Sequence, residues 1–421
     1  MARVVGAGLI GLASALRLQE AGYCVEIYDA SRDEDAASHG NAGHIATEQL
    51  SPLASWSNVR RLPKALMSFG GPVGFPAASA QHWLPFGMKL LAACSAQQYA
   101  RGLECNRVML LQALPTWRQL LKRTHQEALM SEQGHQLVWE TARSTAKGLQ
   151  AWRTADTGTA RVTELDSPAL ATLQKQFAGK PWAGIQFTGT GHLRDLRAVR
   201  AGMREEFVRT GGVFCQRHVL RVRKHAGVAQ LILQGDAPDA AIGSAQDIVV
   251  VCAGVHSKEL IAQDFGKLPM IAERGYHLQF GAQTPTQNEL SGPVVFEDRS
   301  LIVTPFTHGL RLASFTEFSS AHAPADSRKW SALKRHASDL GVSKASLSAS
   351  TWLGSRPTLP DYLPAIGRSQ NVQNLILATG HNHLGVTLAA LTGQLVAQLA
   401  TRQATSVNLD ALSPQRYLSE F

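Results

Sequence analysis

The stretch ARVVGAGLIGLASALRLQEAGYCVEIYDA, residues 2–30, decides the fold of this chain. A short β-branched strand leads into Gly6, Gly8 and Gly11, a helical pattern follows, and a second strand ends at Asp29. The first glycine allows a tight turn, the second lets backbone approach a pyrophosphate, and the third lets helix and strand pack closely. The helix would present its positive end to the phosphates, and the carboxylate would accept hydrogen bonds from a ribose. The stretch therefore predicts a dinucleotide site, in preference to a glycine-rich turn without a ligand.

A second loop of small residues helps to choose between the dinucleotides. An acid at the position of Asp29 favours a ribose with free hydroxyls, which argues against NADP and leaves NAD and FAD. The loop ASHGNAGHIA, residues 37–46, has Gly40 and Gly43 where backbone can come close to a ligand. It is either a surface loop that caps the next segment or a loop that lies along an extended cofactor. The second interpretation favours FAD.

The rest of the chain alternates between two kinds of pattern. Residues 57–158 contain Pro, Gly, Ser and bulky apolar residues before long helical patterns, and residues 266–345 alternate like an antiparallel sheet with one helix. Residues 1–56, 159–265 and 346–421 contain continuous apolar runs, which are typical of buried parallel strands. We predict an α/β (α+β) fold in which these three segments form a discontinuous Rossmann-like domain. The other two segments would form an interleaved substrate domain with an antiparallel sheet.

Composition narrows the class of protein. Hydrophobic residues make up 44% of the chain and charged residues 17%, which is typical of a globular protein. The five cysteines are scattered without metal-ligand spacing, so we expect free thiols, a reducing compartment and no metal site. No uninterrupted apolar run reaches the ~20 residues of a membrane span. The net charge of +9 is spread along the chain without interleaved aromatic residues, which argues against nucleic acid and fits anionic substrates or an anionic membrane surface.

One basic stretch after residue 56 has two interpretations. Its cations and aromatic residues could form a surface that touches a membrane or docks a partner. The aromatic residues could instead be buried inside a folded substrate domain, which is the interpretation that we favour. The residues concerned are Arg60, Arg61, Lys64, Phe69, Phe75, Trp83 and Phe86.

The C-terminal region contains the clearest candidate for substrate recognition. In TWLGSRPTLPDYLPAIGRS, residues 351–369, Arg356 lies between Gly354 and Pro357, which stiffen the backbone around it. Such an arginine suits bidentate recognition of a carboxylate, although a surface arginine in a proline-rich turn gives the same pattern. A buried strand, a glycine, two histidines and an apolar helix follow in LILATGHNHLGVTLAALTGQL, residues 375–395.

Together these patterns resemble the D-amino acid oxidase/dehydrogenase family of FAD-dependent flavoproteins, which includes glycine and sarcosine oxidases. The match is closest to bacterial D-amino acid dehydrogenases and covers nearly the whole chain. It rests on six stretches in the expected order: VVGAGLIGLASALRLQEAG, NAGHIA, GHLRDLRAVRAGM, CAGVHS, WLGSRPTLPDYLPAIG and TGHNHLGVTLAALTGQL. The resemblance implies a discontinuous FAD domain and a second domain whose sheet covers the flavin.

For the cofactor, the resemblance adds a second helix N-terminus to that of the glycine motif. The segment from Gly380 to Thr387 would wrap the flavin ring, and the helix that begins near Gly385 would stabilise the anionic reduced flavin at N1 and O2. No cysteine follows Cys252, so we expect FAD to be held non-covalently. The residues assigned to FAD are Gly6, Gly8, Leu9, Ile10, Gly11, Asp29, Ala30, Asn41, Ala42, Gly43, His44, Ile45, Val219 (at the adenine), Ala253, Gly254, Gly380, His383, Leu384, Gly385, Val386 and Thr387.

For the substrate, the resemblance implies that Arg356 binds the carboxylate, because it is the arginine of the family's G-x-R-P motif. His383 falls where glycine oxidases have a second arginine, and His44 would lie on the other side of the flavin or at the pocket rim. The tyrosine that oxidases of the family usually have is replaced here by Leu301. Tyr276 is our candidate for the missing hydroxyl. The predicted catalytic set is therefore Arg356, His383, His44 and Tyr276.

The expected activity is oxidation of a D-amino acid to an imino acid, which water hydrolyses to a 2-oxo acid and ammonia. Hydride would pass to flavin N5, and the electrons to a quinone or another carrier. Two alternatives stay open: a glycine/sarcosine-type or D-proline/D-hydroxyproline-type amine oxidase or dehydrogenase, and a flavoprotein subunit that transfers electrons for a partner. We expect a cytoplasmic location, either free or peripheral on the inner face of the membrane.

Overall fold

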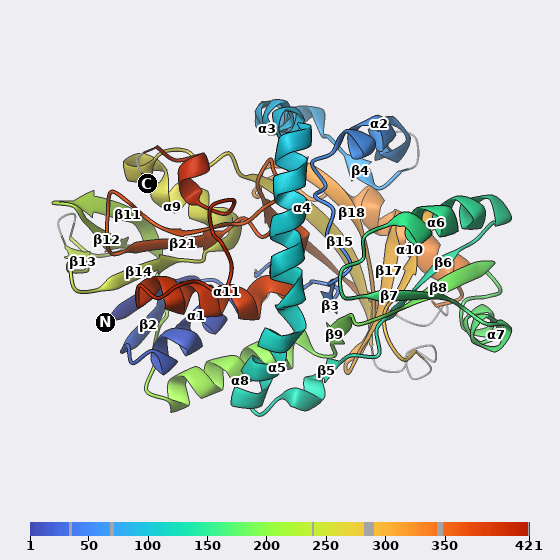
Figure 1. The fold of residues 1–421 in the computed structure, drawn as a ribbon, viewed down its shortest axis with the longest axis horizontal. Helices are drawn as coiled ribbons and strands as arrows, with labels where there is room; N and C mark the ends of the chain where they lie inside the picture. The colour runs from blue at the N-terminus through green and yellow to red at the C-terminus, as the bar shows by residue number, and fades with distance from the viewer. Residues whose placement is uncertain (33–35, 68–70, 238–239, 282–289, 343–347, 420) are drawn as a thin grey trace.

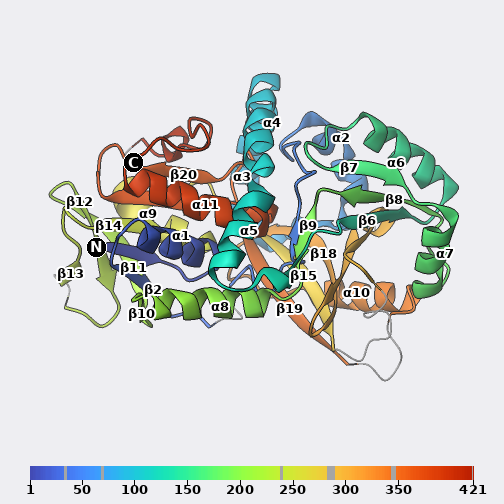
Figure 2. The same cartoon turned by 60° about the horizontal axis from the view of Figure 1, so that its bottom comes forward.

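A computed structural model describes residues 1–32, 36–67, 71–237, 240–281, 290–342, 348–419 and 421. Two large sheets divide the protein between them, a parallel sheet on the left of Figure 1 and an antiparallel sheet on the right. Helix α4 (Ala96–Leu111) stands upright between the two halves there and in Figure 2. The predicted combination of a Rossmann-like sheet and an antiparallel sheet is confirmed.

The parallel sheet has the first strand of the chain near its centre. In spatial order its strands are β10 (Val213–Cys215), β2 (Val25–Tyr28), β1 (Ala2–Val5), β14 (Ile248–Val251), β21 (Leu375–Thr379) and β20 (Ala365–Arg368). Neighbouring strands are parallel except β20 and β21, which are antiparallel. Segments from the beginning, middle and end of the chain therefore build one sheet, so the Rossmann-like part is discontinuous in sequence.

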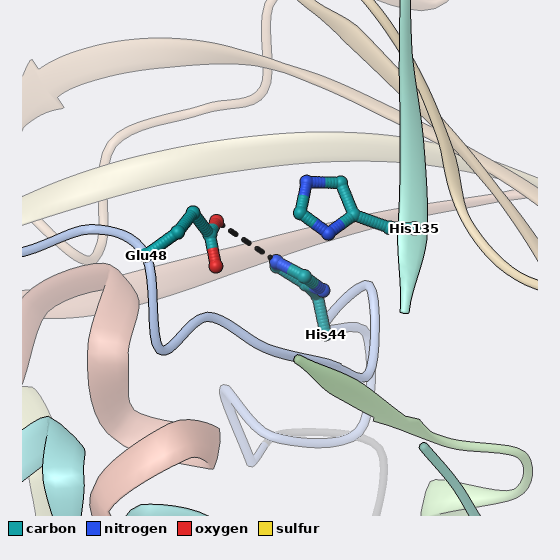
Figure 3. A group of neighbouring side chains, drawn as sticks. All are labelled: His44, Glu48 and His135. Atoms are coloured by element: carbon teal, nitrogen blue, oxygen red, sulfur yellow. Dashed lines mark hydrogen bonds and ion pairs between the residues drawn. The ribbon is translucent and has the colours of Figure 1, made fainter. Parts of the chain in front are cut away.

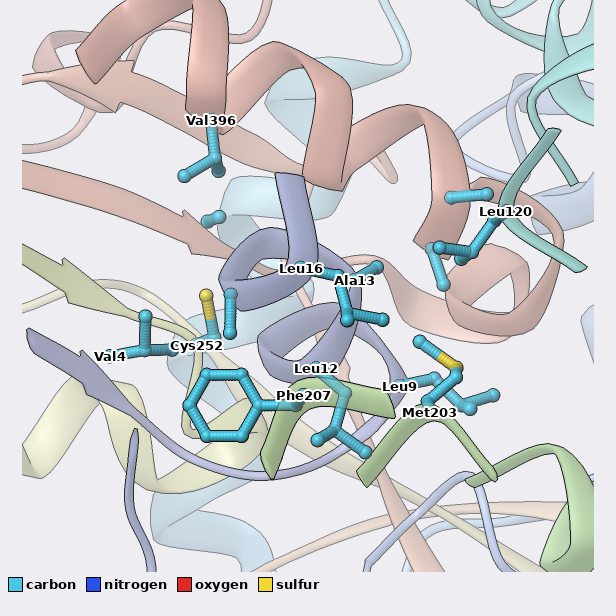
Figure 4. Close-up of a cluster of buried hydrophobic side chains, with 14 of the residues drawn as sticks. Val4, Leu9, Leu12, Ala13, Leu16, Leu120, Met203, Phe207, Cys252 and Val396 are labelled. Atoms are coloured by element: carbon cyan, nitrogen blue, oxygen red, sulfur yellow. The ribbon is translucent and has the colours of Figure 1, made fainter. Parts of the chain in front are cut away.

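Helices cover one face of this sheet, and a small sheet with one helix covers the other. The helices on the first face are α1 (Leu9–Glu20), α5 (Ala113–Arg123), α8 (Leu196–Arg209) and α11 (Gly385–Ala400). The elements on the second face are β11 (Val219–His225), β12 (Val228–Leu233), β13 (Ala241–Ile242) and α9 (Ser257–Phe265). Side chains such as Leu12, Met203 and Phe207 enclose the first face (Figure 4), and the central strands β1, β14 and β21 are buried on both sides.

Helix α11 packs tightly against α1. A Cβ on Gly393 would lie 2.6 Å from the carbonyl carbon of Ala13, so the glycine lets the two backbones approach each other. The stretch Asn382–Ala400 is long and apolar enough to span a membrane by composition, but 67% of its apolar window is buried inside the protein. Its position in the core accounts for its hydropathy.

In the described chain, the antiparallel sheet has nine strands. In spatial order they are β19 (Ala349–Thr358), β15 (Ile271–Phe280), β18 (Gly309–Ser319), β17 (Leu301–Phe306), β16 (Val294–Phe296), β6 (His135–Trp139), β8 (Ala183–Thr188) and β7 (Arg161–Glu164), while β4 (Val73–Gly74) pairs with β18. Helices α10 (Ser327–Asp339) and α7 (Ser167–Gln176) pack on one face of this sheet. The other face of β15 contacts the parallel half, where His277 Nδ1 lies 2.9 Å from the carbonyl oxygen of Gly40.

A small sheet connects the two halves. It contains β3 (His44–Ile45), β9 (Gly191–Leu193) and β5 (Met130–Ser131). The other helices are α2 (Trp56–Ala65), α3 (Ala80–Ala93) and α6 (Ala142–Thr154). Because β3 follows the second small-residue loop, this sheet holds that loop where the two halves meet.

The sheets to which three strands belong correct the domain assignment of parts of two predicted segments. Strands β7 and β8 lie in the antiparallel sheet, whereas the sequence patterns place 159–265 in the Rossmann-like domain. Strand β19 also lies in the antiparallel sheet, whereas the patterns place 346–421 in the Rossmann-like domain. Alternation identifies a strand but not its partners, and β8 pairs with β6 while β19 pairs with β15, which is far away in sequence.

The glycine motif gives a prediction that separates packing from ligand binding. A Cβ on Gly11 would lie 1.9 Å from the carbonyl oxygen of Gly6, whereas no described atom lies within 4 Å of a Cβ on Gly8. Gly11→Ala should therefore lower the free energy of unfolding by about 1–3 kcal/mol, because backbone has to shift. Gly8→Ala should change it by less than about 0.5 kcal/mol. Urea unfolding of both variants in the same flavin state measures this; equal stabilities would contradict the packing argument.

Candidate functional site

The turn between β1 and α1 fits a phosphate group. Gly6 has a φ of +104°, and a Cβ there would lie 2.7 Å from the carbonyl oxygen of Cys252. Within the described chain, no side chain caps the N-terminus of α1 at Gly8, and the space around the Cβ position of Gly8 is open. The first N–H groups of α1 are therefore left for an anion, which the positive end of the helix also attracts. The turn can accept the pyrophosphate of FAD.

Asp29 lies across this turn, as its position in the sequence predicts. Its Oδ2 accepts a hydrogen bond from the backbone N–H of Ala7 at 2.7 Å, and its Oδ1 accepts one from the N–H of Ser31 at 2.8 Å. The carboxylate thus connects the end of β2 to the glycine loop. Ala30 follows it on the surface. Binding of the ribose by Asp29 stays a prediction.

The other residues assigned to FAD follow the carboxyl edge of the parallel sheet. Ala253 and Gly254 come directly after β14, and the hydroxyl of Thr379 donates to the carbonyl of Gly254 at 2.9 Å. Gly380 comes after β21 with a φ of +79°. Val219 begins β11, in the layer below the sheet. Ligands of parallel sheets bind at this edge, so the residues lie where a dinucleotide would be expected.

The two segments assigned to the flavin ring contact each other. The hydroxyl oxygen of Thr387, in the first turn of α11, accepts a hydrogen bond from the N–H of Ala46 at 3.0 Å. In the 41–45 loop, the N–H of Gly43 donates to Oδ1 of Asn41 at 2.8 Å. In the described structure no side chain caps the N-terminus of α11 at Leu384, so its first N–H groups are available to a ligand.

Two imidazoles at this end have buried nitrogen atoms that need a partner. Among the described residues, nothing hydrogen-bonds Nδ1 of His44 or Nδ1 of His383, although both atoms are buried. Buried polar atoms are normally paired, so unpaired ones suggest a missing ligand. Together with the two uncapped helices, they show that the residues present fit an FAD molecule.

Arg356 and Glu273 lie directly opposite each other on β19 and β15. Their Nη1 and Oε1 atoms are 3.5 Å apart, and the Arg356 side chain is 29% exposed while that of Glu273 is 4% exposed. The guanidinium crosses Gly275, where a Cβ would lie 2.5 Å from Nη2. Only a glycine leaves room for it there. Among the described residues, Glu273 is the side chain that pairs with this guanidinium, which leaves most of its donors for an anionic ligand.

Two further side chains that the sequence patterns do not single out interact with Glu273. The hydroxyl of Thr358 donates to Oε2 of Glu273 at 3.0 Å, and Tyr362 is electrostatically coupled to this carboxylate. Burial and the neighbouring Glu273 raise the pKa of Tyr362 well above its ordinary value. Thr358 also pairs through its backbone with His381. The Arg356 strand therefore ends at the loop that is predicted to wrap the flavin.

His383 lies in the same group, as the resemblance implies. Its ring is 6.4 Å from that of Tyr362, and it is electrostatically coupled to Glu273 and Arg356. Desolvation by burial lowers the pKa of His383 to about 4, so the imidazole is neutral at neutral pH. A neutral imidazole can donate or accept a hydrogen bond but does not add a second positive charge beside Arg356.

The expectation that Tyr276 lies beside Arg356 is wrong. Successive side chains of a strand point to opposite faces, and Tyr276 is on the face opposite Glu273. Its hydroxyl contacts Glu317 at 3.4 Å and accepts a hydrogen bond from the N–H of Asp326 at 3.0 Å. Leu301 is buried in the same hydrophobic cluster as Tyr276. Tyr362 is the tyrosine that the structure places near Arg356.

His44 belongs to a buried cluster with Glu48 and His135 (Figure 3). His44 Nε2 is 3.1 Å from Glu48 Oε1, and the rings of His44 and His135 meet edge to face at 4.4 Å. Burial lowers the pKa of His135 to about 3, and its Nδ1 lies 3.0 Å from the hydroxyl of Thr190. One ligand atom from each of the three residues lies within 4.8 Å of the others, so they could hold a cation only if His44 released Glu48. The cluster is therefore best described as a hydrogen-bonded pair, His44 and Glu48, packed on a neutral imidazole.

The lowered pKa of Glu48 predicts a dependence of stability on pH. Burial alone would raise the pKa of Glu48, but the adjacent His44 outweighs it and lowers the pKa from 4.5 to about 2. The stabilisation is therefore complete above about pH 4.5 and is lost as the pH falls towards 2. Glu48→Gln should cost on the order of 1–3 kcal/mol at neutral pH. Melting temperatures of both proteins should converge between pH 4.5 and 2; a constant difference would contradict the assignment.

Comparisons with known proteins agree with this site. The family model described as FAD dependent oxidoreductase matches residues 2–399. A D-amino-acid oxidase of Bradyrhizobium diazoefficiens is 26% identical over 99% of this chain and 98% of that protein. A D-amino acid dehydrogenase of Vibrio vulnificus is 25% identical over 99% of both. The solved structure of glycine oxidase from Geobacillus kaustophilus has a TM-score of 0.71 at 19% identity, covering 98% of this chain and 97% of that one.

Proposed function

Because the chain belongs to the family of FAD-dependent oxidoreductases and its cofactor is FAD, we propose that it oxidises D-amino acids to imino acids, which water converts to 2-oxo acids and ammonia. The electrons would pass to a quinone or another carrier. The names of the relatives from Bradyrhizobium diazoefficiens and Vibrio vulnificus support D-amino acids as the substrate class. FAD, when bound, would accept hydride from the carbon next to the amine, and the ammonium group would give up one proton, to Glu273 or to water, so that the imino acid forms.

The observation that carries the proposal is the pairing of Arg356 with Glu273. An amino acid has one anionic and one cationic group on the same carbon, and the site has a cation and an anion on adjacent strands. The guanidinium of Arg356 can bind the carboxylate with two parallel hydrogen bonds. Glu273 Oε2 is occupied by Thr358, so Oε1 is the oxygen that can accept a hydrogen bond from the amine.

These two contacts would fix the orientation of the substrate. Cα of an amino acid has four substituents, and Arg356 and Glu273 would fix two of them, the carboxylate and the amine. The shape of the pocket would then decide which of the two remaining positions holds the side chain and which holds the hydrogen. Holding reacting groups in this way is worth about 7–11 kcal/mol of the barrier in the best cases. Thr358 holds Glu273 in place through its hydroxyl, and it would act on the substrate only through Glu273.

The roles of Arg356 and Glu273 can be separated by comparing two types of ligand, amino acids and simple carboxylates. Arg356→Lys should weaken binding of both amino acids and simple carboxylates such as benzoate, and lower kcat/KM by about 100-fold or more, because an ammonium cannot copy the planar fork. Glu273→Gln should raise KM for the amino acid while benzoate binds at least as well. Steady-state kinetics and the flavin difference spectrum measure both.

Arg209→Lys is the matched control for these variants, since Arg209 lies on α8, pairs with Glu206 and has 67% of its side chain exposed. It should leave kinetics and benzoate binding unchanged. Near-normal kcat/KM in Arg356→Lys would remove the assigned role. Equal losses for amino acid and benzoate in Glu273→Gln would show that Glu273 only supports the arginine.

The substrate class is tested by anaerobic addition of single compounds to the yellow protein. Bleaching of the flavin by D-amino acids and not by their L-enantiomers is the expected result. Bleaching only by glycine, sarcosine or cyclic amines would move the assignment to those amines. Reduction only after a partner protein is added would replace the proposal with an electron-transfer subunit.

A further inference from the structure

The described aromatic residues of the basic stretch pack inward, Phe86 completely and Phe75 and Trp83 in part. Phe75, Trp83 and Phe86 pack in one hydrophobic cluster with Ile271 and Phe318, and Phe86 is only 5% exposed. Phe69 lies outside the described residues. A docking surface made of these aromatic side chains is therefore not present in the described structure. The same segment nevertheless exposes other apolar residues.

Helix α3 presents an apolar face to solvent. Leu84, Met88 and Leu91 are 52%, 67% and 43% exposed. Their spacing of four and then three residues puts them on one side of the helix. Trp56, at the beginning of α2, is 49% exposed. Helices α2 and α3 are joined through Val59, which packs in the same small cluster as Leu90 and Ala93 of α3, and both lie at the top of the view in Figure 1.

The charge of this segment has one sign. Residues 49–103 contain no aspartate or glutamate, whereas a stretch of that length in this chain would on average contain about four. The basic residues within it are Arg60, Arg61, Lys64, Lys89 and Arg101, and all five are exposed. Lys89 lies on α3 itself, between Met88 and Leu91 in sequence. The exposed apolar residues are thus accompanied only by cations within the segment.

We propose that this surface, formed by α2 and α3, binds an anionic lipid membrane. Apolar side chains on one side of a helix, flanked by lysine and arginine, are the pattern of segments that lie in the headgroup region. Each basic residue near an anionic leaflet adds about 1 kcal/mol of attraction. A two-fold contact with a second copy would bring these cations against the same cations, which disfavours a dimer through this face.

The surface also borders a groove that reaches Glu273. This groove of about 1970 Å³ runs between α2, α3 and β18. Leu84, Met88 and Leu91 line one side of it, and Glu273 and Tyr362 line another part. A protein that rests on the membrane through α3 would therefore have this groove next to the lipid. Membrane binding itself does not depend on the proposed activity, so the two can fail separately.

Sedimentation with vesicles tests the proposal on the flavin-loaded protein. Vesicles of equal parts phosphatidylglycerol and phosphatidylcholine should bind it, and vesicles of phosphatidylcholine alone should bind it at least tenfold less. Substituting Leu84, Met88 and Leu91 together by Ser, or Arg60, Arg61 and Lys64 together by Gln, should lower binding tenfold or more. High salt should weaken the binding of the unmodified protein.

A control variant changes Val208, Val213 and Leu220 to Ser, since these are 51%, 53% and 50% exposed elsewhere on the molecule. It should bind like the unmodified protein, and all variants should keep their circular dichroism and flavin content. Three results would overturn the proposal. They are no binding to anionic vesicles, binding that neither the apolar triple variant (at Leu84, Met88 and Leu91) nor the basic triple variant changes, and a dimer that the apolar triple variant abolishes. Binding to an acidic polypeptide such as polyglutamate but not to vesicles would assign the surface to a protein partner instead.

Discussion

The close contact between α1 and α11 is the constraint on which the site depends. Gly393 lets α11 approach the backbone of Ala13, and the two helices lie on the same face of the parallel sheet. Each helix follows a parallel strand, so both N-termini face the carboxyl edge of the sheet. One uncapped N-terminus would meet the pyrophosphate and the other the flavin ring. The first and the last α-helix of the described chain would thereby serve a single cofactor.

The register of β15 with β19 supplies the substrate side. It sets Glu273 opposite Arg356 and His277 opposite Trp352, so charged groups and stacked rings share one face. The ring of Trp352 lies where a Cβ on Gly40 would be, 2.1 Å from its Cε3 atom. The second small-residue loop is therefore docked on the antiparallel sheet. A shift of one residue in this register would turn Arg356 to the α10 side and leave no carboxylate-binding group in the site.

Much of this arrangement could be predicted from the sequence. The glycine motif, the small-residue loop and the arginine between Gly354 and Pro357 each have a local physical reason, and the structure has the uncapped helix, the tight loop and the partly exposed guanidinium that they predict. The parts that could not be predicted depend on pairing between distant strands. Alternation could not say which sheet β8 joins or which face Tyr276 occupies, because the phase of a strand is set by its partners.

Glu273 and the exposed face of α3 could not be identified from the sequence for the same reason, because both depend on contacts between segments that are distant in sequence. A glutamate in a strand becomes a site residue only when its neighbour across the ladder is known. In α3 the aromatic residues would be the obvious surface markers, yet they turn inward onto Phe318 while aliphatic residues stay outside. Helical spacing alone does not tell which of two apolar faces is covered.

The central claim is that Arg356 and Glu273 together bind an amino acid as a zwitterion. A crystal structure of the FAD-bound protein with 2-methylalanine, which has no hydrogen on Cα and cannot be oxidised, tests it most directly. The account predicts the carboxylate on the guanidinium of Arg356 and the amine within about 3.2 Å of Glu273. A carboxylate bound elsewhere, or an amine that turns away from Glu273, would contradict it.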